Sequence, residues 1–234
     1  MQGLDLEVSS GSKYQKSFFI LLIATTIFRL FYIQWVELAP DEAYYWTWSR
    51  HLQWGYYDHP PMIGFLIWIF TAIAGQGEFG VRLGWVFIGV LLTLLLYLMG
   101  KKMFDSERAG FYSALLMNII LLASAGAIIV TPDGPQGLFW ALAVFCVYQS
   151  VSRKGIHWWY LTGISLGLGL LSKYTMILLA PCIFFFLLSS PEGRKWLTRK
   201  EPYLSFLLGL AIFLPPISSY TFRQPGPSPA SSLP

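Results

Sequence analysis

Long apolar stretches separated by short polar segments run through most of the chain. A helix that crosses a bilayer needs about 20 mainly apolar residues, with a range of roughly 17 to 25. Stretches near this length predict spanning helices at 17–36, 81–99, 110–130, 135–151, 158–172, 174–190 and 203–222. The shorter run 61–74 begins at a Pro-Pro pair and stops before Gly75. Its length favours a juxtamembrane helix that lies at the membrane surface.

Composition supports a membrane protein. Hydrophobic residues make up 55% of the chain and charged residues only 12%, and the mean hydropathy is +0.55. A soluble domain carries about 25% charged residues. We therefore predict an all-α, polytopic transmembrane helix bundle of about seven spans plus the juxtamembrane helix. The net charge of +4 does not indicate nucleic acid, because in a membrane protein the position of each charge matters more than the sum.

The positive charges fix an orientation if 61–74 does not span. The polar segments on one side then hold eleven cations: Lys13, Lys16, Lys101, Lys102, Arg108, Arg153, Lys154, Arg194, Lys195, Arg199 and Lys200. The other side holds four: Arg50, Arg82, Lys173 and Arg223. Because loops rich in lysine and arginine stay in the cytoplasm, the N-terminus is predicted to be cytoplasmic. The loop 37–80 is then predicted to face the outer side, which in a bacterium is the periplasmic face of the inner membrane.

Three regions follow from these patterns. Residues 1–16 form a polar N-terminal segment, 17–222 form the membrane domain with its outer loop at 37–80, and 223–234 (RQPGPSPASSLP) have the composition of a disordered tail. The composition changes abruptly after Pro216. This change suggests a truncated or frameshifted reading frame.

The most informative segment is PDEAYYWTWSRHLQWGYYDHPP, residues 40–61. Asp41 and Glu42 follow the first predicted span, where charge is costly unless it faces water or a partner. Such a pair can act as a general base or orient a hydroxyl. The ordinary alternative is a helix N-cap. Tyr44, Tyr45 and Tyr57 suit stacking on a sugar ring, although an interfacial aromatic belt is the better explanation for most of the aromatic residues in this segment.

Two further acidic motifs fall on the same predicted face. Asp58 precedes His59 and a rigid Pro-Pro turn, and a neighbouring carboxylate favours a protonated imidazole that can bind phosphate. A structural Asp-His hydrogen bond is the alternative. Asp133 lies in the short loop TPDGP, which is also ordinary turn chemistry. Carboxylates from separate loops can hold a polar acceptor or a cation between them.

Three of the cations outside the cytoplasmic set suggest a specific partner. Lys173 sits between two apolar runs on the face poor in positive charge, which makes it a candidate ligand for a lipid phosphate or, alternatively, a snorkelling lysine. Arg82, at the start of its predicted span, is a weaker candidate for the same phosphate. Arg29 lies inside the first span and is predicted to pair within the bundle.

The order of these motifs is specific. A first span ending in Asp41-Glu42, the aromatic loop closing on DHPP, and then RLGWVFIG, KKMFDSERAG, TPDGP and GLGLLSKYT follow one another. This order resembles the polyprenyl-phosphate-dependent membrane glycosyltransferases, which include the protein O-mannosyltransferases and the lipid A aminoarabinose or galacturonosyl transferases. The resemblance covers residues 17–215 and implies the GT-C fold. Family members are longer, with more spans.

The resemblance also implies roles. Asp41 matches the essential acid of the first loop, Glu42 its neighbour, Asp133 the acid of the second outer loop, and Lys173 a recurrent lysine near the lipid phosphate. His59 stands where several relatives have lysine. The implied reaction transfers a sugar, with inversion, from a polyprenyl phosphate to a lipid, glycan or protein acceptor at the outer face. The donor is the only cofactor-like group implied; no metal ligand is predicted, and a divalent cation stays open.

Two other classes remain. A transporter or flippase for a lipid-linked sugar would bind the same groups without making bonds, but transporters usually place charges near the membrane midplane. A non-catalytic, truncated subunit is the second alternative. Loss of function in Asp41→Asn with normal insertion would separate the enzyme from the subunit.

Overall fold

The chain forms a bundle of helices. The computed structural model describes residues 2–153 and 155–223, and every regular element within these ranges is helical. The elements are α1 (Gln2–Tyr32), α2 (Pro40–Arg50), α3 (Met62–Ala74), α4 (Glu78–Phe104), α5 (Glu107–Ile119), α6 (Leu121–Ala125), α7 (Asp133–Arg153), α8 (His157–Ser172), the 3-10 helix η1 (Tyr174–Leu178), α9 (Leu179–Ser189), α10 (Pro191–Leu197) and α11 (Glu201–Arg223). The predicted tail, apart from Arg223, lies outside the described residues.

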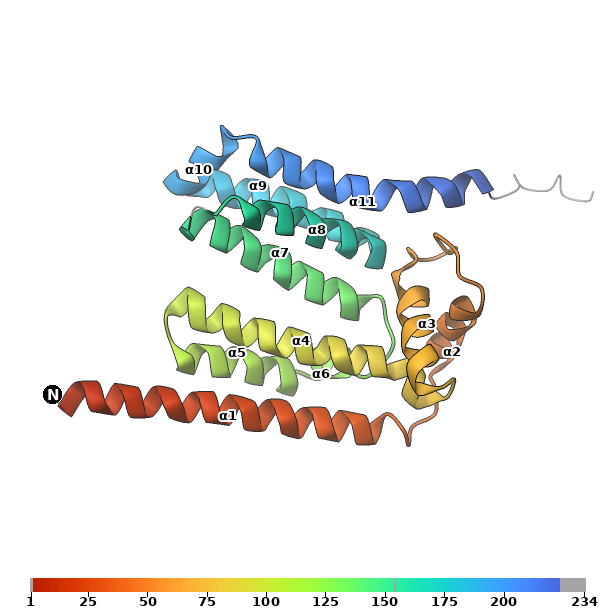
Figure 1. Cartoon of the computed structure of the whole chain (residues 1–234), viewed down its shortest axis with the longest axis horizontal. Helices are drawn as coiled ribbons and strands as arrows, with labels where there is room; N and C mark the ends of the chain where they lie inside the picture. Colours follow the sequence, from red (N-terminus) through yellow and green to blue (C-terminus); the bar gives the residue numbers. More distant parts are fainter. Residues whose placement is uncertain (1, 154, 224–234) are drawn as a thin grey trace, which may run out of the picture.

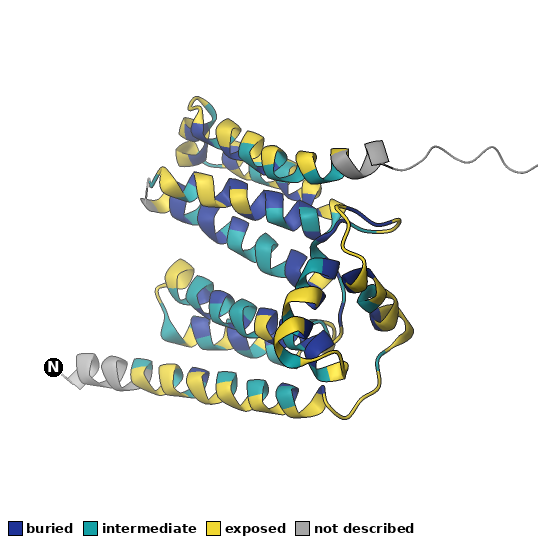
Figure 2. Ribbon diagram, turned by 45° about the vertical axis from the view of Figure 1, so that its right-hand side comes forward, coloured by how far each residue is buried: buried dark blue, intermediate teal, exposed yellow. Residues whose placement is uncertain are grey.

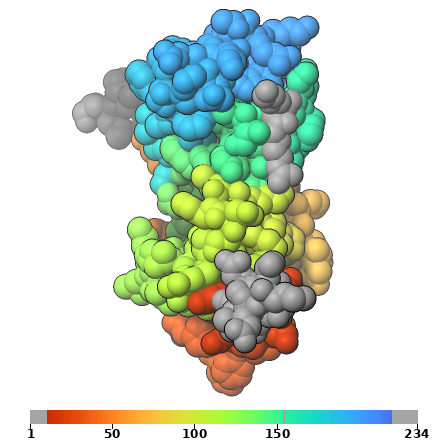
Figure 3. Space-filling model, turned by 90° about the vertical axis from the view of Figure 1, so that its left-hand side faces the viewer, coloured from red at the N-terminus to blue at the C-terminus, as the bar shows by residue number. Residues whose placement is uncertain are grey.

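The long helices run side by side from one end of the molecule to the other (Figure 1). Helix α1 packs on α5 and α4, α4 packs on α7, and α7 packs on α8, which in turn packs on α11. Viewed end-on, α1 and α11 form opposite edges of this stack (Figure 3). The short helices α2 and α3 close one end, where α4 and α7 begin and α8 finishes (Figure 1). We call it the α2–α3 end.

Helices α1, α4 and α11 contain segments long and apolar enough to cross a membrane, at Gly11–Tyr32, Glu78–Phe104 and Glu201–Ser218. These agree with three of the seven predicted spans. Helix α3 matches the predicted juxtamembrane helix almost residue for residue, since Pro61 precedes it and Gly75 ends it at a positive φ of 90°. Its position relative to a bilayer stays a prediction, as does the total of seven spans.

The predicted span 110–130 is not one continuous helix. Helix α5 ends at Ile119, Ile120 adopts an extended conformation, and the single turn α6 leads into an irregular loop, 126–132. The backbone of this loop is partly satisfied by side chains from elsewhere, because the N–H of Val130 donates to the carboxylate of Glu42. The apolar pattern predicted one span here, whereas the structure breaks the helix at Ile120 and leaves Leu121 and Leu122 more than 80% exposed.

Helix α1 is the most exposed of the long helices, as expected for a helix whose surface faces lipid (Figure 2). The one charge in its apolar part, residues 17–32, is Arg29, which points inward and is only 2% exposed. Arg29 Nη2 donates to Oδ1 of Asn118 on α5 at 2.8 Å, and Asn118 Nδ2 lies 3.2 Å from Oγ1 of Thr93 on α4. The predicted pairing of Arg29 within the bundle is confirmed, and its partner is a neutral amide.

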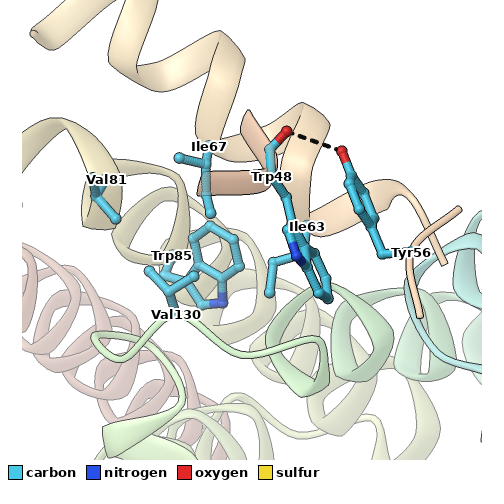
Figure 4. Packing of buried hydrophobic residues seen from close by; sticks show 7 residues of the cluster. All are labelled: Trp48, Tyr56, Ile63, Ile67, Val81, Trp85 and Val130. Carbon is cyan, nitrogen blue, oxygen red and sulfur yellow. Dashed lines mark hydrogen bonds between the residues drawn. The ribbon is translucent and has the colours of Figure 1, made fainter. Parts of the chain in front are cut away.

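An apolar cluster holds α2 and α3 against the bundle (Figure 4). The indole of Trp48 stacks on the ring of Tyr56 at 4.2 Å, and the Tyr56 hydroxyl donates to the backbone oxygen of Trp48 at 3.1 Å. Trp85 extends the cluster into α4, and its Nε1 donates to the backbone oxygen of Thr131 at 2.9 Å. The cluster consists of Trp48, Tyr56, Ile63, Ile67, Val81, Trp85 and Val130. The cluster therefore holds both the aromatic segment 40–61 and the loop 126–132 in place.

Helices α8 and α11 approach each other closely through small residues. A side chain at Gly163 would place its Cβ 2.4 Å from the backbone oxygen of Ser205, closer than Cβ atoms come to other atoms in real structures. A Cβ at Gly209 would lie 3.1 Å from the oxygen of Gly163. Small residues at helix crossings are typical of membrane bundles, where close backbone packing replaces the hydrophobic effect.

Candidate functional site

The residues predicted to carry chemistry gather at the α2–α3 end, and the start of α2 provides the first of them. Helix α2 begins at Pro40, a residue suited to the first turn because that turn needs no backbone N–H from it. Asp41 and Glu42 occupy this turn, where carboxylates favour the positive end of the helix dipole. Their surroundings differ completely, since Asp41 is exposed and Glu42 is fully buried.

Glu42 is the centre of a buried network. Its Oε1 accepts from Nε of Arg82 at 2.9 Å and from the N–H of Val130 at 2.9 Å. Its Oε2 accepts from Nη2 of Arg82 at 2.5 Å and from the N–H of Ala39 at 2.9 Å. Burial alone would raise the pKa of Glu42, but these donors outweigh it and hold the pKa below its ordinary value. Glu42 is therefore ionised at neutral pH.

Arg82 is enclosed with its partner. Its side chain is 3% exposed, and besides the carboxylate it donates to the backbone oxygens of Val36 at 2.5 Å and Glu37 at 2.8 Å. The sequence suggested Arg82 as a phosphate ligand. In the structure its donors point to protein acceptors, so a direct contact with a phosphate would require this network to open.

Lys173 and Asp133 form a second ion pair, which is more exposed than the pair of Glu42 and Arg82. Helix α8 ends at Ser172, Lys173 continues in an extended conformation, and its Nζ lies 2.7 Å from Oδ1 of Asp133 in the first turn of α7. The side chain of Asp133 is 63% exposed, and that of Lys173 is 29% exposed. A nearby hydrogen bond of 2.8 Å from Gln136 Nε2 to Thr175 Oγ1 ties the same two segments together.

Tyr45 connects Asp41 with the other acids. Burial raises the pKa of the Tyr45 phenol, and the carboxylates of Asp41, Asp58 and Asp133 raise it further. The three acids belong to separate segments of the chain, and the charge of each acts on the Tyr45 phenol. The Tyr44 hydroxyl lies 3.4 Å from Oδ2 of Asp58, a long contact at the edge of the same group.

His59 lies beside Tyr45, with ring centroids 5.9 Å apart. Burial and the charge of Lys173 lower the pKa of His59, whereas Asp58 and Asp133 raise it, and the net direction is downward. In the sequence only Asp58 is visible beside His59, and that neighbour alone predicts a more basic imidazole. Because its pKa lies below the ordinary value, His59 is mainly neutral at pH 7.

The remaining predicted residue, Tyr57, points into solvent with 93% of its surface exposed. It is therefore available for contact but is not held in place. Sequence reasoning missed Trp85 and Val130, which position the loop before Asp133 through an indole N–H and a backbone N–H. Val130 looked like an ordinary apolar residue of a span, and Trp85 drew notice only as part of the motif RLGWVFIG.

Apolar grooves lead away from this end of the bundle. One, of about 500 Å³, lies between α4, α6 and α7 and includes Thr131 and Asp133 in its lining. Another, of about 490 Å³, lies between α3, α4 and α7 and begins near Met62 and Pro135. The first is lined mainly by aliphatic side chains and glycines, and the second by aliphatic and aromatic side chains, which suits hydrocarbon chains. Among the described residues, no group of three His, Cys, Asp or Glu side chains is arranged to hold a metal ion.

The chain matches a known protein family. The family model described as dolichyl-phosphate-mannose-protein mannosyltransferase matches residues 58–218. The lipid A galacturonosyltransferase RgtD of Rhizobium johnstonii is 26% identical over 182 residues, which is 76% of this chain and 38% of that protein. The undecaprenyl phosphate-alpha-4-amino-4-deoxy-L-arabinose arabinosyl transferase of Erwinia tasmaniensis is 26% identical over 189 residues, covering 69% of this chain and 33% of that protein.

Solved structures show the same fold. ArnT from Cupriavidus metallidurans in the apo state superimposes with a TM-score of 0.75 at 18% identity and covers 90% of this chain and 43% of that one. The Saccharomyces cerevisiae Pmt1-Pmt2 complex bound to the sugar donor gives a TM-score of 0.64 at 18% identity, with 90% and 33% covered. The chain thus spans well under half the length of the relatives that it matches.

Proposed function

Because the chain belongs to the dolichyl-phosphate-mannose-protein mannosyltransferase family, we propose that it forms the N-terminal, site-bearing part of a membrane glycosyltransferase. The reaction moves a sugar from a polyprenyl phosphate to a lipid, glycan or protein acceptor at the outer face of the membrane, with inversion at the anomeric carbon. The observation that carries this proposal is the meeting of Asp41, Asp133, Lys173 and His59 at one end of an apolar bundle.

In this proposal Asp41 is the general base. It is exposed at the start of α2, and an ionised carboxylate there can accept the proton of an acceptor hydroxyl as the new glycosidic bond forms. The bond between the anomeric carbon and the phosphate oxygen breaks, and the lipid phosphate leaves with its electron pair. Lys173 stabilises this developing negative charge. Asp133 orients Lys173 and the sugar.

The surroundings suit such substrates. The grooves beside α4 offer apolar walls for prenyl or acyl chains that end near Asp133 or Met62. The aromatic side chains Tyr44 and Tyr57 offer faces for a sugar ring. Relatives named for lipid A transfer and for an undecaprenyl phosphate donor support this substrate class.

The test is sugar transfer in membranes that contain the chain, with radiolabelled polyprenyl-phosphate sugars as donors and lipid A or a hydroxyl-bearing peptide as acceptor. We expect transfer by the wild type and none by Asp41→Asn, while Asp105→Asn at the opposite end stays active. Equal transfer by Asp41→Asn would refute the general-base role. Donor bound by the wild type but not turned over with any acceptor would favour the non-catalytic subunit.

A further inference from the structure

We propose that Glu42 and Arg82 form a positioning clamp that sets the separation of Asp41 and Asp133 without touching substrate. The proposal rests on the function proposed above, which assigns the chemistry to those two acids. It replaces a direct catalytic role for Glu42 and a phosphate-binding role for Arg82, both of which the sequence suggested.

The first support is that the Glu42 carboxylate has no hydrogen-bond acceptor site left for a substrate. Its two oxygens accept four hydrogen bonds, two on each, and an ionised carboxylate offers about four acceptor sites. The residue is also completely buried. A group that exchanges protons with a substrate must reach it directly or through one water, and Glu42 has neither a free lone pair nor an open face.

The second support is the matching occupation of Arg82. Its four hydrogen bonds go to Glu42 and to the backbone oxygens of Val36 and Glu37. These bonds leave little of the guanidinium's donor capacity for a phosphate. Because both charges are buried and each satisfies the other, the pair acts as a structural unit whose halves cannot be removed singly without leaving an uncompensated charge.

The third support is that the clamp connects the two segments that carry Asp41 and Asp133. Asp41 is the residue before Glu42 and shares its helical turn, while Val130, which donates to Glu42, lies three residues before Asp133. One carboxylate therefore binds both the helix that carries the first acid and the loop that leads to the second. Arg82 adds the start of α4 and the segment after α1. A shift of either acid requires this joint to open.

The experiment compares Glu42→Gln, Arg82→Met and the double variant in the full chain in nanodiscs. Hydrogen exchange measured by mass spectrometry reports on residues 36–42 and 126–132, and transfer assays give kcat and KM. In Glu42→Gln we expect exchange in both segments to quicken about tenfold or more. We expect kcat to fall about 100-fold through misplacement of the acids, with the donor KM changed less than about twofold.

The double variant separates positioning from chemistry. It removes both buried charges together, so a positioning role predicts a kcat at least about threefold above that of either single variant. A directly catalytic Glu42 predicts no recovery. The matched control is Glu107→Gln, which breaks the ion pair with Lys101 (2.5 Å) near the far end of α4, about 29 Å from Arg82 along the helix axis. It should change neither exchange in 126–132 nor kcat.

Two results would overturn the clamp: unchanged exchange in 126–132 of Glu42→Gln, or a folded double variant as inactive as the worse single variant. If Glu42→Gln does not insert, Glu42→Asp takes its place, because its shorter carboxylate keeps the charge but cannot reach all four donors. If the wild type itself transfers no sugar, the proposed function fails. The hydrogen-exchange rates in 36–42 and 126–132 then decide alone whether the Glu42–Arg82 clamp exists.

Discussion

Nζ of Lys173 lies 2.7 Å from Oδ1 of Asp133, which joins the end of α8 to the first turn of α7. Unlike the Glu42–Arg82 pair, this ion pair is open to solvent, with Asp133 63% exposed. Exposed pairs contribute about 0–1 kcal/mol. The singly charged phosphodiester of the proposed donor, and the second negative charge that develops as the phosphate leaves, can therefore draw Lys173 away from Asp133 at little cost. The pair suits a ligand-responsive contact better than a structural one.

Replacing Lys173 by alanine should therefore weaken donor use more than it weakens the fold. We expect the donor KM to rise and kcat to fall, because both the bound phosphate and the leaving phosphate lose a charge-assisted hydrogen bond. The midpoint of thermal unfolding should move only slightly. Lys173→Arg should retain part of the activity. A large loss of thermal stability in Lys173→Ala, with normal KM in the surviving protein, would contradict this assignment.

The lowered pKa of His59 predicts a specific pH dependence of stability. The unfolded chain has a histidine pKa near 6.5, and in the folded state it is lower. Between the two values the unfolded state binds more protons, so stability falls as pH drops below about 6.5. His59→Gln should remove this contribution. Thermal unfolding of both proteins from pH 7.5 to 5.5 tests it, and a wild type no more acid-sensitive than the variant would contradict the expectation.

The close approach of α8 and α11 predicts that Gly163 tolerates no side chain. In Gly163→Ala the added Cβ would meet the backbone oxygen of Ser205 at 2.4 Å, and backbone cannot yield as a side chain can. Overpacking of this kind costs about 1–3 kcal/mol. Gly77→Ala is the matched control, since nothing lies within 4 Å of its added Cβ. Thermal unfolding in detergent should show a lower midpoint for the first variant only.

The orientation predicted from the charges can be tested with single cysteines in a background without Cys146 and Cys182. Tyr57→Cys, at a side chain that is 93% exposed, should react with a membrane-impermeant maleimide in intact cells. Lys13→Cys should react only after the membrane is opened. The reverse pattern would place the α2–α3 end in the cytoplasm and remove the outer-face site.

Hydropathy, together with the proline and glycine residues that begin and end helices, predicted much of the fold. Pro61 and Gly75 delimit α3 in the sequence as they do in the structure, because proline and glycine act on the backbone locally. The break after Ile119 could not be predicted in this way. In the loop that follows, the Val130 N–H donates to Glu42, which is 88 residues away in the chain. The apolar pattern around Val130 gives no information about so distant a partner.

The sequence was enough to predict which residues share one face of the membrane. It was not enough to predict which way each side chain points. The charge pattern grouped Asp41, Asp133 and Lys173 on one face, and the structure brings them to one end of the bundle. Asp41 and Glu42 looked equivalent in the sequence. Neighbouring residues on a helix point about 100° apart, so one faces solvent and the other enters the core, and only the packing of α4 decides which.

The hydrogen bond between Arg29 and Asn118 has a consequence for biosynthesis. The two residues are 89 positions apart, so at a synthesis rate of about 5–20 residues per second the first helix waits about 4–18 s for its partner. During that interval the guanidinium in the last turn of α1 has no Asn118 side chain to accept its hydrogen bond. Helix α1 therefore gains this inward hydrogen bond only after α5 has been synthesised.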